Sequence, residues 1–503
     1  MSKPFYITTP LYYVNAKPHI GHAYTNIVCD TFARFHRFLG EEVRFMTGTD
    51  EHGTKIDRAA KDQGKDAKVY VDEMVPLFQS LWNLLGIQYD YFIRTTDDNH
   101  QQIVQNILKA LEAKGDIYRG KYKGWYCTPC ESFWTETQLA EGKCPDCHRD
   151  VQQLAEDNYF FRLSKYQSWL VGYLRDSPRF VWPETRRNEI LSFLERPLED
   201  LCITRPRARL TWGIAYPSSP EHVVYVWFDA LVNYVSGVAY SKDMKQFSRF
   251  WPADLHVVGK DILRQHAIYW PIMLKAIDVE MPRTVLAHGW WTIEGSKVSK
   301  SRGNVVDPFE IVKRYGADAF RYYLLHEARL GLDGSYSEDL LVERLNSDLA
   351  DDLGNLVLRA TSMLERYFSG RIPDATSSAT PLRGKLASMT DLVKNAMLGF
   401  QPYAALDAIW EVVREANRFV EQNKPWVLAK ENKKEELGNF LVGLLETVRL
   451  LGLVLTSFLP STAEKILSSL GINGRPSIQD MQWGSLKAGV RVEKGVPLFP
   501  KVE

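Results

Sequence analysis

The chain has 503 residues, of which 45% are hydrophobic and 25% charged, a composition typical of a globular protein with several domains. Its 62 basic and 62 acidic residues give a net charge of zero, which argues against a protein that binds polyanions through its overall charge. A local basic surface for a nucleic acid is still compatible with this balance.

Three features bear on the compartment. The first predicted strand begins within a few residues of Met1, and no basic segment followed by an apolar one precedes it. The most apolar late stretch, residues 440–459, contains Glu446 and Arg449 and keeps a helical period, so it indicates a buried helix, not a membrane span. Four of the six cysteines form two close pairs, which suits a reducing compartment. We expect a cytoplasmic protein without a membrane partner.

Strand and helix patterns alternate through the first part of the chain. This alternation predicts a parallel sheet with crossover helices, whose ligands bind beyond the carboxyl ends of the strands. The predicted strands are 5–9 and 43–47, and the predicted helices are 23–39, 66–86 and 100–114. Because His19 and Asp50 lie just past predicted strand ends, we expect both to face one crevice.

The helix that follows the first strand begins with Pro-His-Ile-Gly-His at 18–22. This places His19 and His22 three residues apart on one face of the first turn, and Gly21 between them leaves room for a ligand. A helix N-terminus attracts phosphate, and neutral imidazoles can add hydrogen bonds. The motif therefore predicts a phosphate site, although chance explains so short a pattern about equally well.

The alternation breaks at about 116 and resumes at about 222. The later pattern predicts strands at 223–228, 255–259 and 284–288, and helices at 229–240 and 261–276. An interruption of roughly 100 residues has the size of a small domain, so we expect an insertion in the sheet domain.

The inserted segment holds two Cys-x-x-Cys pairs, Cys127 with Cys130 and Cys144 with Cys147. Four thiolates at this spacing can surround a zinc ion tetrahedrally and leave no open position, so we predict one structural zinc per chain. The alternatives are unligated thiols or two local disulfides, and His148 is a possible alternative ligand.

A basic, serine-rich segment, Lys-Val-Ser-Lys-Ser at 297–301, follows the last predicted strand. By itself it fits a solvated loop, but Lys297 and Lys300 could also close over a leaving phosphate group, because glycines flank the loop. Asp307 and Pro308 then fit the N-cap and first residue of a helix.

After about 345 the pattern is helical throughout and predicts an antiparallel bundle. The predicted helices are 347–368, 402–422, 435–458 and 461–470, with a longer loop at about 369–385. Ser461 and Glu464 fit a capping box, and Gly471 follows the end of the last helix.

The motifs at 18–22 and 297–301, in this order and approximate separation, resemble the two signatures of class I aminoacyl-tRNA synthetases. Trp-Phe-Asp-Ala at 227–230 and Gly-Lys-Asp-Ile at 259–262 before His266 resemble methionyl-tRNA synthetases, as does the single cysteine knuckle. The likeness extends to about 470, although that family often has Ala where Pro10 stands and Pro where Leu231 stands.

The resemblance implies an α/β fold: a Rossmann-like parallel sheet with an inserted zinc-knuckle connective domain, followed by an all-α helical-bundle domain that binds the anticodon. We expect the catalytic nucleotide-binding domain at 1–115 and 223–293 and the connective insertion at 116–222. The KVSKS loop and stem-contact region would be 294–345, and the helical domain 346–503.

The resemblance also implies the reaction and its residues. Methionine would be activated with ATP and Mg²⁺ to methionyl-adenylate and pyrophosphate, then passed to the 3′-terminal ribose of tRNA(Met), as translation initiation and elongation require. The implied catalytic residues are His19, His22, Lys297 and Lys300, and the implied ATP contacts are His19, Gly21, His22, Gly259 and Lys300. The implied methionine contacts are Leu11, Tyr13, Asp50, Trp227, Ala230, Tyr234, Ile262 and His266. Asn355, Arg359 and Trp426 would read the CAU anticodon.

Asp50 would bind the methionine ammonium, and Lys300 is the principal lysine of the second motif. Taken singly, the aromatic residues fit an ordinary core, Trp426 a core tryptophan, and Asn355 with Arg359 a polar pair on a helix surface. Because the chain ends soon after the resemblance does, we expect a monomer.

Three other hypotheses about the function are compatible with the sequence. A synthetase for leucine, isoleucine or valine would need a large editing domain, for which the insertion is too short, and a cysteine enzyme is a further possibility. An adenylyltransferase of the same fold would not need the helical region with Trp426. A non-catalytic relative that binds tRNA would not need Asp50 and the intact motif at 297–301.

Overall fold

The structure is a computed structural model that describes residues 3–130, 132–134, 136–293, 296–297, 306–375 and 381–502. Its contacts divide the chain into two compact units. The sheet unit comprises residues 1–18, 44–80 and 89–288, and the helical unit comprises residues 19–43, 81–88 and 289–503. The N-terminal part therefore contributes to both units, which are described separately below.

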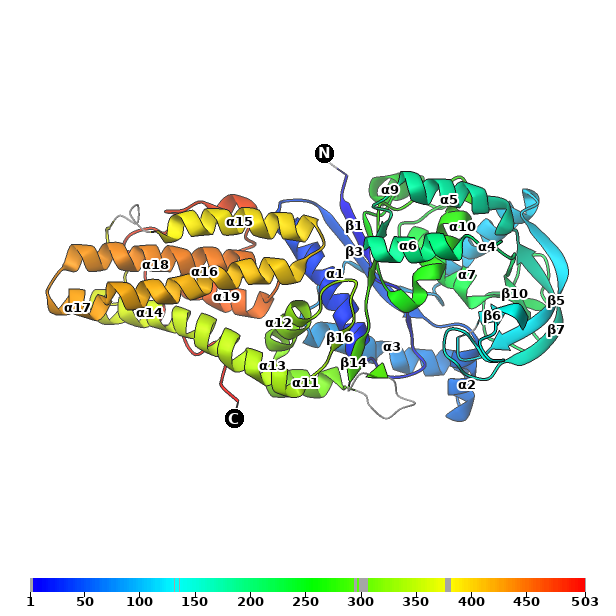
Figure 1. Cartoon of the computed structure of the whole chain (residues 1–503), viewed down its shortest axis with the longest axis horizontal. Helices are drawn as coiled ribbons and strands as arrows, with labels where there is room; N and C mark the ends of the chain where they lie inside the picture. Colours follow the sequence, from blue (N-terminus) through cyan, green and yellow to red (C-terminus); the bar gives the residue numbers. More distant parts are fainter. Residues whose placement is uncertain are drawn as a thin grey trace. The chain divides into compact units, whose positions relative to one another are not determined.

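The sheet unit is built on a seven-stranded sheet with the order β2-β3-β1-β12-β13-β8, to which β4 adds beside β3 (Figure 1). The strand pairs whose register the structure gives are parallel, as the alternating pattern predicts. The strands are β1 (Phe5–Thr8), β2 (Tyr12–Tyr13), β3 (Val43–Asp50), β4 (Tyr91–Arg94), β8 (Val181–Trp182), β12 (Leu255–Gly259) and β13 (Val285–His288).

Helices follow the strands as crossover connections. They are α2 (Thr54–Asp62), α3 (Ala67–Leu84), α4 (Asp98–Ala113), α7 (Val226–Leu231), α8 (Asn233–Ser236), α9 (Met244–Phe250), the short helix η3 (Lys260–Ile262), the π-turn η4 (Gln265–Tyr269) and α10 (Trp270–Ala276). Gly48 in β3 shows how tightly the strands pack, because a Cβ there would lie 2.0 Å from the carbonyl oxygen of Ile93 in β4. Asp50 and Gly259 end their strands and so lie at the carboxyl edge of this sheet.

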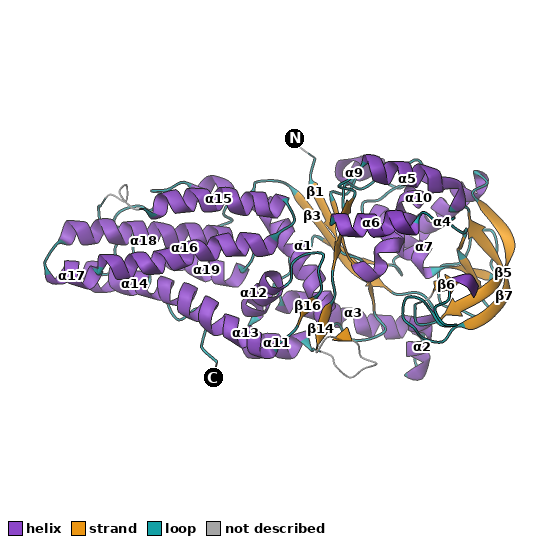
Figure 2. Ribbon diagram, viewed as in Figure 1, coloured by secondary structure: helices purple, strands orange, loops and turns teal. Residues whose placement is uncertain are grey.

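The segment predicted as an insertion forms a second, antiparallel sheet with the order β6-β5-β7-β9 and a small pair β10-β11 (Figure 2). Its elements are β5 (Ile117–Cys127), β6 (Ser132–Trp134), η1 (Glu136–Gln138), β7 (Gln152–Phe161), η2 (Ser164–Tyr166), α5 (Gln167–Asp176), α6 (Glu184–Phe193), β9 (Leu201–Cys202), β10 (Thr204–Pro206) and β11 (His222–Val224). This segment also supplies β8 to the parallel sheet, where Val181 lies opposite Val285, a pairing that no sequence pattern predicted. Two residues are too few to show a periodicity.

The predicted strand at 223–228 is wrong in extent and partner. Only His222–Val224 is extended, it pairs antiparallel with β10, and α7 begins at Val226. The run Val-Val-Tyr-Val-Trp-Phe has high β-propensity, but both faces of α7 are buried in this unit, and tertiary packing overrides propensity there.

The helical unit contains α1 (Ile20–Phe38) and the C-terminal helices, of which α14, α15, α16 and α18 pack side by side (Figure 2). The other helices are α11 (Pro308–Tyr315), α12 (Ala317–Glu327), α13 (Glu338–Arg344), the π-helix η6 (Leu345–Gly354), α14 (Asn355–Phe368), α15 (Leu382–Leu398), α16 (Pro402–Asn423), α17 (Pro425–Lys430), α18 (Lys434–Leu455), α19 (Pro460–Ser469) and η7 (Ile478–Met481). A small sheet with the order β15-β14-β16 joins Ser296–Lys297, Trp291–Ile293 and Gly334–Ser335.

A buried ion pair ties α1 to α12. Arg321 on α12 lies 2.8 Å from Asp30 on α1, and both side chains are fully buried. Arg321 also donates to the carbonyl oxygen of Phe458 at 2.8 Å, and Asp30 accepts from Arg34 at 2.7 Å. Burial alone raises the pKa of the Asp30 carboxyl, but the guanidinium groups of Arg321 and Arg34 lower it below its ordinary value.

Helix α18 is long and apolar enough to cross a membrane, but 94% of its most apolar stretch is buried inside the protein. It is therefore the central helix of the bundle, as the helical period with Glu446 and Arg449 predicted. These two residues form a buried ion pair at 2.8 Å, and Arg449 also donates to the carbonyl oxygen of Asp480.

Two details of the predicted bundle are wrong. Helix α19 begins at Pro460, one residue before the predicted capping box, and its N-cap Leu459 has no side-chain acceptor. The Thr462 N–H donates instead to Asp318 Oδ2 of α12 at 2.6 Å, so the cap comes from another helix. The predicted helices also do not include α15, whose start overlaps the predicted loop at about 369–385, a stretch rich in Gly, Pro, Ser and Thr.

Candidate active site and metal-binding cluster

The two histidines of the 18–22 motif lie at the first turn of α1 and form a reciprocal cap. His19 is the N-cap residue, and its Nδ1 accepts a hydrogen bond from the Gly21 N–H at 3.1 Å. His22 Nδ1 accepts from the His19 N–H, also at 3.1 Å, and the two rings stack with centroids 3.8 Å apart. Gly21 permits this stack, since a Cβ there would lie 3.0 Å from the His19 ring.

This cap determines which nitrogen carries the proton. Each Nδ1 accepts from a backbone N–H, so it carries no proton, and in the neutral ring the proton is on Nε2. Both rings can therefore present an Nε2–H donor beside the positive end of α1. That arrangement suits the phosphate contact predicted from the sequence.

The first group of predicted methionine contacts lies where β2 and β3 end. Tyr13 in β2 lies directly opposite Asp50 in β3, and Leu11 immediately precedes β2. The Asp50 side chain is 3% exposed. Lys55 lies over the Tyr13 ring at 4.6 Å. A buried carboxylate is thus placed beside an aromatic ring, a combination that suits an amino-acid ammonium.

A second group of predicted contacts lies on α8, η3 and η4. Tyr234 Oη lies 2.7 Å from His266 Nε2, and His266 Nδ1 lies 2.8 Å from the carbonyl oxygen of Ile262. Because a carbonyl can only accept, His266 Nδ1 donates and His266 Nε2 accepts from the tyrosine hydroxyl. Burial lowers the pKa of His266 to about 4, so this imidazole is uncharged at neutral pH.

Trp227 and Ala230 lie on α7, which packs against η4 and therefore close to His266. Leu11, Tyr13, Trp227 and Ile262 all pack, partly buried, against the same hydrophobic core. The structure thus places all eight predicted methionine contacts in the sheet unit. His19 and His22 belong to the other unit, so the shared crevice with Asp50 stays a prediction.

The predicted ATP contact Gly259 ends β12 opposite His288, where the chain turns into η3. A Cβ at this position would lie 2.6 Å from Asp261 Oδ1, so a larger residue here would displace the Asp261 side chain. Of the 297–301 motif, Lys297 pairs through its backbone with Thr292, and Lys300 lies outside the described residues.

The residues after Asp50 have structural partners that sequence reasoning missed. The buried Glu51 carboxylate accepts from Arg94 Nε at 2.6 Å and from the hydroxyls of Thr49 and Thr96, each at 2.6 Å. His52 Nδ1 lies 2.7 Å from Asp229 Oδ2. The only sequence signal for the second contact is a charged residue within the apolar run at 226–231.

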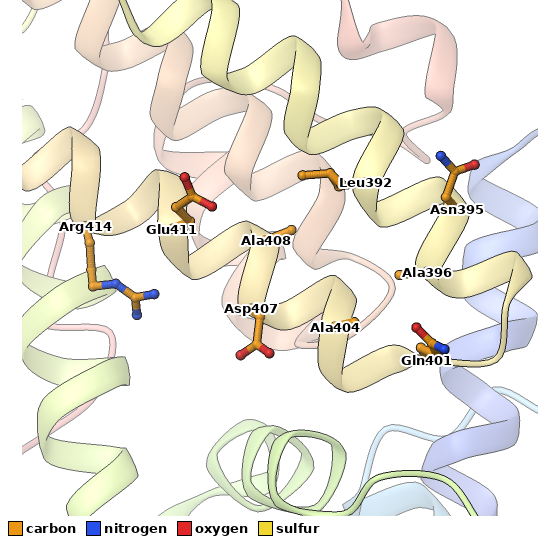
Figure 3. A pocket seen from close by; sticks show the side chains of 9 residues that line it. All are labelled: Leu392, Asn395, Ala396, Gln401, Ala404, Asp407, Ala408, Glu411 and Arg414. Carbon is orange, nitrogen blue, oxygen red and sulfur yellow. The ribbon is translucent and has the colours of Figure 1, made fainter.

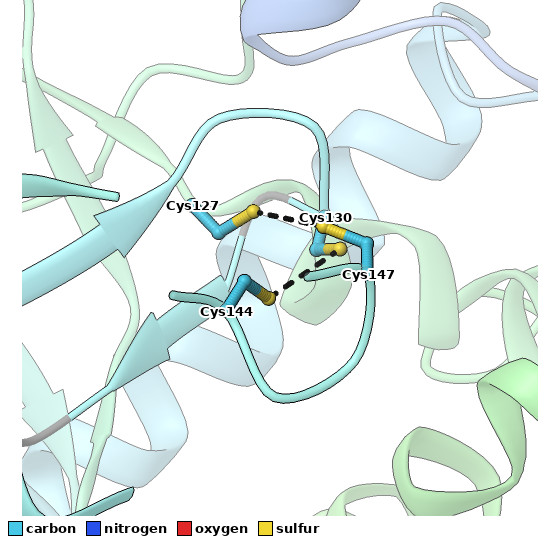
Figure 4. Close-up of side chains that lie close together, drawn as sticks. All are labelled: Cys127, Cys130, Cys144 and Cys147. Carbon is cyan, nitrogen blue, oxygen red and sulfur yellow. Dashed lines mark hydrogen bonds between the residues drawn. The ribbon is translucent and has the colours of Figure 1, made fainter. Parts of the chain in front are cut away.

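The four paired cysteines converge on one point at the end of β5 and the loop that follows (Figure 4). Their sulfur atoms all lie within 4.8 Å of one another, with Cys127 to Cys147 at 3.5 Å and Cys130 to Cys144 at 3.8 Å. Zn–S bonds of about 2.3 Å in a tetrahedron require sulfur separations of about 3.8 Å, so the cluster can hold such an ion.

Two of the alternatives considered for these cysteines, the local disulfides and His148 as a ligand, are not found in the structure. All six cysteines lie within the described residues, and none is in a disulfide. The ligand atoms that converge come from the four cysteines alone among the described residues, so His148 is not a member of the cluster. Hydrogen bonding, first of all from Cys130, lowers the pKa of Cys127 to about 5, so one thiolate is already favoured.

The predicted anticodon residues lie in the bundle. Asn355 and Arg359 share one face of α14 and line a groove of about 410 Å³ with residues of α16, and Arg359 pairs with Glu421 there at 2.6 Å. Trp426 is the second residue of α17 and is 45% exposed, so it is not a core residue of the bundle.

A second groove, of about 560 Å³, lies between α15 and α16 (Figure 3). It is lined by Leu392 and three alanines together with the polar residues Asn395, Gln401, Asp407, Glu411 and Arg414. None of the residues predicted from the sequence lines this groove, so it plays no part in the proposed site.

A family model described as tRNA synthetases class I (M) matches residues 5–156 and 151–361. A methionine–tRNA ligase of Caldanaerobacter subterraneus is 48% identical over 100% of this chain and 80% of its own length, and one of Thermotoga maritima is 46% identical over 99% of this chain and 80% of its own length. A Mycobacterium tuberculosis methionyl-tRNA synthetase in complex with methionyl-adenylate superimposes with a TM-score of 0.95 at 39% identity, covering 99% of this chain and 100% of that one.

The parallel sheet, the histidine pair that begins α1 and the matched family model define a class I aminoacyl-tRNA synthetase. Within that class, the chain belongs to the methionyl-tRNA synthetase family. The readings as a synthetase for another amino acid and as an adenylyltransferase are therefore set aside.

Proposed function

We propose that the chain acts as a methionine–tRNA ligase through the residues predicted from its sequence. In the first step, a carboxylate oxygen of methionine attacks the α-phosphorus of ATP, the bond to the β-phosphate breaks and pyrophosphate leaves. In the second step, a ribose hydroxyl at the 3′ end of tRNA attacks the methionyl carbonyl and AMP leaves. Both steps need positioned reactants and donors aimed at developing negative charge.

The Nε2–H groups of His19 and His22, with the N-terminus of α1 and Gly21, would bind phosphate oxygens of ATP. Gly259 would let ATP approach the end of β12. Lys300, with Lys297, would neutralise the departing pyrophosphate, and Mg²⁺ would accompany the phosphates. These assignments rest on the family likeness of the two motifs together with the capping geometry at α1.

The methionine site would combine one buried anion with an uncharged lining. Asp50 would bind the ammonium, while Leu11, Tyr13, Trp227, Ala230, Tyr234, Ile262 and His266 would surround the side chain. An uncharged His266 matters here, because a cation beside the pocket would repel the ammonium and disfavour the thioether. The buried Asp50 beside this neutral aromatic lining is the observation that supports the proposal most.

The four-cysteine cluster would hold one structural zinc ion, which would fix the loops at the end of β5. In the bundle, Trp426 could stack on an unpaired base of the CAU anticodon, and Asn355 and Arg359 could contact base edges or phosphates of tRNA(Met). We further propose a cytoplasmic, monomeric enzyme with the domain boundaries predicted above.

The test is ATP–pyrophosphate exchange, screened over the twenty amino acids. Methionine should give the highest exchange, and Lys300→Ala should lower it by about 10²–10³-fold, the loss typical of one charge-stabilising donor. Exchange with another amino acid, or none with methionine, would contradict the activity. Normal exchange by the Lys300 variant would contradict only the role of that lysine.

A further inference from the structure

A carboxylate that the reaction does not use lies buried next to the proposed methionine site. Asp229 on α7 accepts from His52 Nδ1 through Oδ2 and from His100 Nε2 through Oδ1, each at 2.7 Å. The side chains of Asp229, His52 and His100 are 0%, 4% and 1% exposed. A buried carboxylate that bridges two imidazoles is expensive to desolvate, so its position requires an explanation.

The bridge continues beyond the second histidine. His100 Nδ1 lies 2.7 Å from Ser236 Oγ on α8, and Ser236 Oγ lies 3.3 Å from the carbonyl oxygen of Asn233. Burial raises the pKa of Asp229, but His52 and the hydrogen bonds from both imidazoles lower it below its ordinary value. The carboxylate is therefore ionised and accepts an N–H from each ring.

The residues of this bridge alternate along the chain with the proposed methionine contacts. His52 is two residues after Asp50, Asp229 is two residues after Trp227 and next to Ala230, and Ser236 is two residues after Tyr234. The bridge thus joins the β3 loop to α7 and, through His100, to α8, and all three carry proposed methionine contacts. The hydrogen bond between His52 and Asp229 connects the β3 loop to α7.

The loop after β3 is also held from its other side. Glu51 accepts from Arg94, Thr49 and Thr96, while the indole of Trp212 donates to the Glu51 carbonyl oxygen. Asp50 is therefore followed by two fixed residues, Glu51 held by Arg94 and His52 held by Asp229. The second of these connections reaches α7, which carries pocket residues.

We propose that Asp229 is a positioning residue of the methionine site. Through His52 it sets the distance between Asp50, which binds the ammonium, and α7, which lines the side-chain pocket. His100 and Ser236 hold the other carboxylate oxygen and keep Asp229 in place. This inference rests on the proposed function of Asp50 and deepens it, because it names what makes ammonium recognition and side-chain recognition act together.

The substitution Asp229→Asn tests this positioning role without changing the size of the side chain. The asparagine side chain has one oxygen that accepts and one NH2 group that donates. It can therefore accept an N–H from only one imidazole, and the other imidazole must change its tautomer or lose its bond. Misplacement by an ångström can cost about 10²-fold, so we expect the KM for methionine in ATP–pyrophosphate exchange to rise about 10-fold or more. The KM for ATP should change by less than about twofold, because Asp229 holds no phosphate-binding element.

The matched control is Asp116→Asn. Asp116 is also fully buried, and it bonds Lys165 and Tyr166, neither of which adjoins a proposed methionine contact. A purely structural role for Asp229 predicts that both variants lose thermal stability and activity alike, without selective loss of methionine affinity. The proposal would be overturned if Asp229→Asn and Asp116→Asn changed the KM for methionine equally.

A second measurement isolates the ammonium. Binding of methionine is compared with binding of 4-methylthiobutyrate, which is methionine without its ammonium group. The wild type should strongly prefer methionine, and Asp229→Asn should reduce this preference; an unchanged preference overturns the proposal.

If Asp229→Asn does not fold, Ser236→Ala provides a second test, because it removes the far end of the bridge. It should reduce the same preference by a smaller factor, and an unchanged preference again overturns the proposal. Failure of methionine-dependent exchange in the wild type would instead contradict the proposed function.

Discussion

The imidazole rings of His19 and His22 stack at the start of α1 with centroids 3.8 Å apart; His19 Nδ1 accepts from the Gly21 N–H, and His22 Nδ1 accepts from the His19 N–H. The same two side chains thus cap the helix and present Nε2–H donors. Capping and the proposed phosphate binding can be separated, since only capping depends on Nδ1.

The substitution His19→Asn separates them. Asparagine is a good N-cap and can still accept from the Gly21 N–H, so the unfolding free energy should change by only a few tenths of a kcal/mol. The Nε2–H is lost, so ATP–pyrophosphate exchange should fall by about 10²–10³-fold. His36→Asn, near the other end of α1, is the control and should leave exchange unchanged. A parallel loss of melting temperature and exchange in His19→Asn would mean that His19 acts through capping alone.

The metal cluster gives a second prediction. Purified protein should contain about one zinc ion per chain, as measured by elemental analysis, and Cys144→Ser should lower this content. Since three remaining thiolates no longer enclose the ion, the loops after β5 should become more sensitive to proteolysis. Cys202→Ser, at a buried thiol outside the cluster, should keep the zinc. Carefully prepared wild-type protein without zinc would contradict the assignment.

Long periodic segments were predictable from the sequence, and short or context-dependent ones were not. The run at 5–9, the helix after it and the four cysteines carry local signals strong enough to place β1, α1 and the cluster. The strand β8 has two residues, and the helix α7 contradicts its own β-propensity, so only tertiary contacts decide them. The cap of α19 by Asp318 was equally invisible, because its partner lies on another helix.

The candidate site divides in the same way. Family motifs indicated Asp50, Trp227 and His266, and the structure adds the bonds of His266 to Tyr234 and to the carbonyl oxygen of Ile262. The bridge from His52 through Asp229 to His100 joins residues far apart in the chain, and no spacing rule connects them. Buried polar partners of this kind emerge only from the fold.

The lowered pKa of His266 predicts how stability depends on pH. In the unfolded chain this imidazole takes up a proton as the pH falls below about 6.5, whereas in the folded protein it does so only near pH 4, because burial disfavours the cation. The folded state therefore binds fewer protons in this window, and stability falls as the pH decreases through it. His256, whose pKa burial also lowers, contributes in the same direction.

The variant His266→Gln tests this dependence. Glutamine can accept from Tyr234 and donate to Ile262 but does not titrate. Between pH 6.5 and 4 the wild type should lose about 3 kcal/mol through His266, at 1.36 kcal/mol per unit of pKa shift, and the variant should lack this part. Urea unfolding at several pH values measures it. An identical slope in both proteins would show that His266 titrates normally.

The last prediction concerns Trp426, which is 45% exposed at the start of α17, in the same unit as the groove lined by Asn355 and Arg359. An exposed indole contributes little to the core, so Trp426→Ala should leave the melting temperature and methionine-dependent pyrophosphate exchange close to those of the wild type. Loss of one stacking partner costs about 1–3 kcal/mol, so charging of tRNA(Met) should fall by about one to two decades.

Two control variants, one at a valine and one at a second tryptophan, make this result specific. Val427→Ala removes an exposed neighbour, 37% accessible, that has no aromatic face, and should leave charging unchanged. Trp410→Ala removes a tryptophan that is 2% exposed, so about 3–5 kcal/mol of stability should be lost. If Trp426→Ala behaves like Trp410→Ala, losing stability, exchange and charging together, the indole does not read the anticodon. Loss of charging alone, with a tRNA whose CAU anticodon is intact, means that it does.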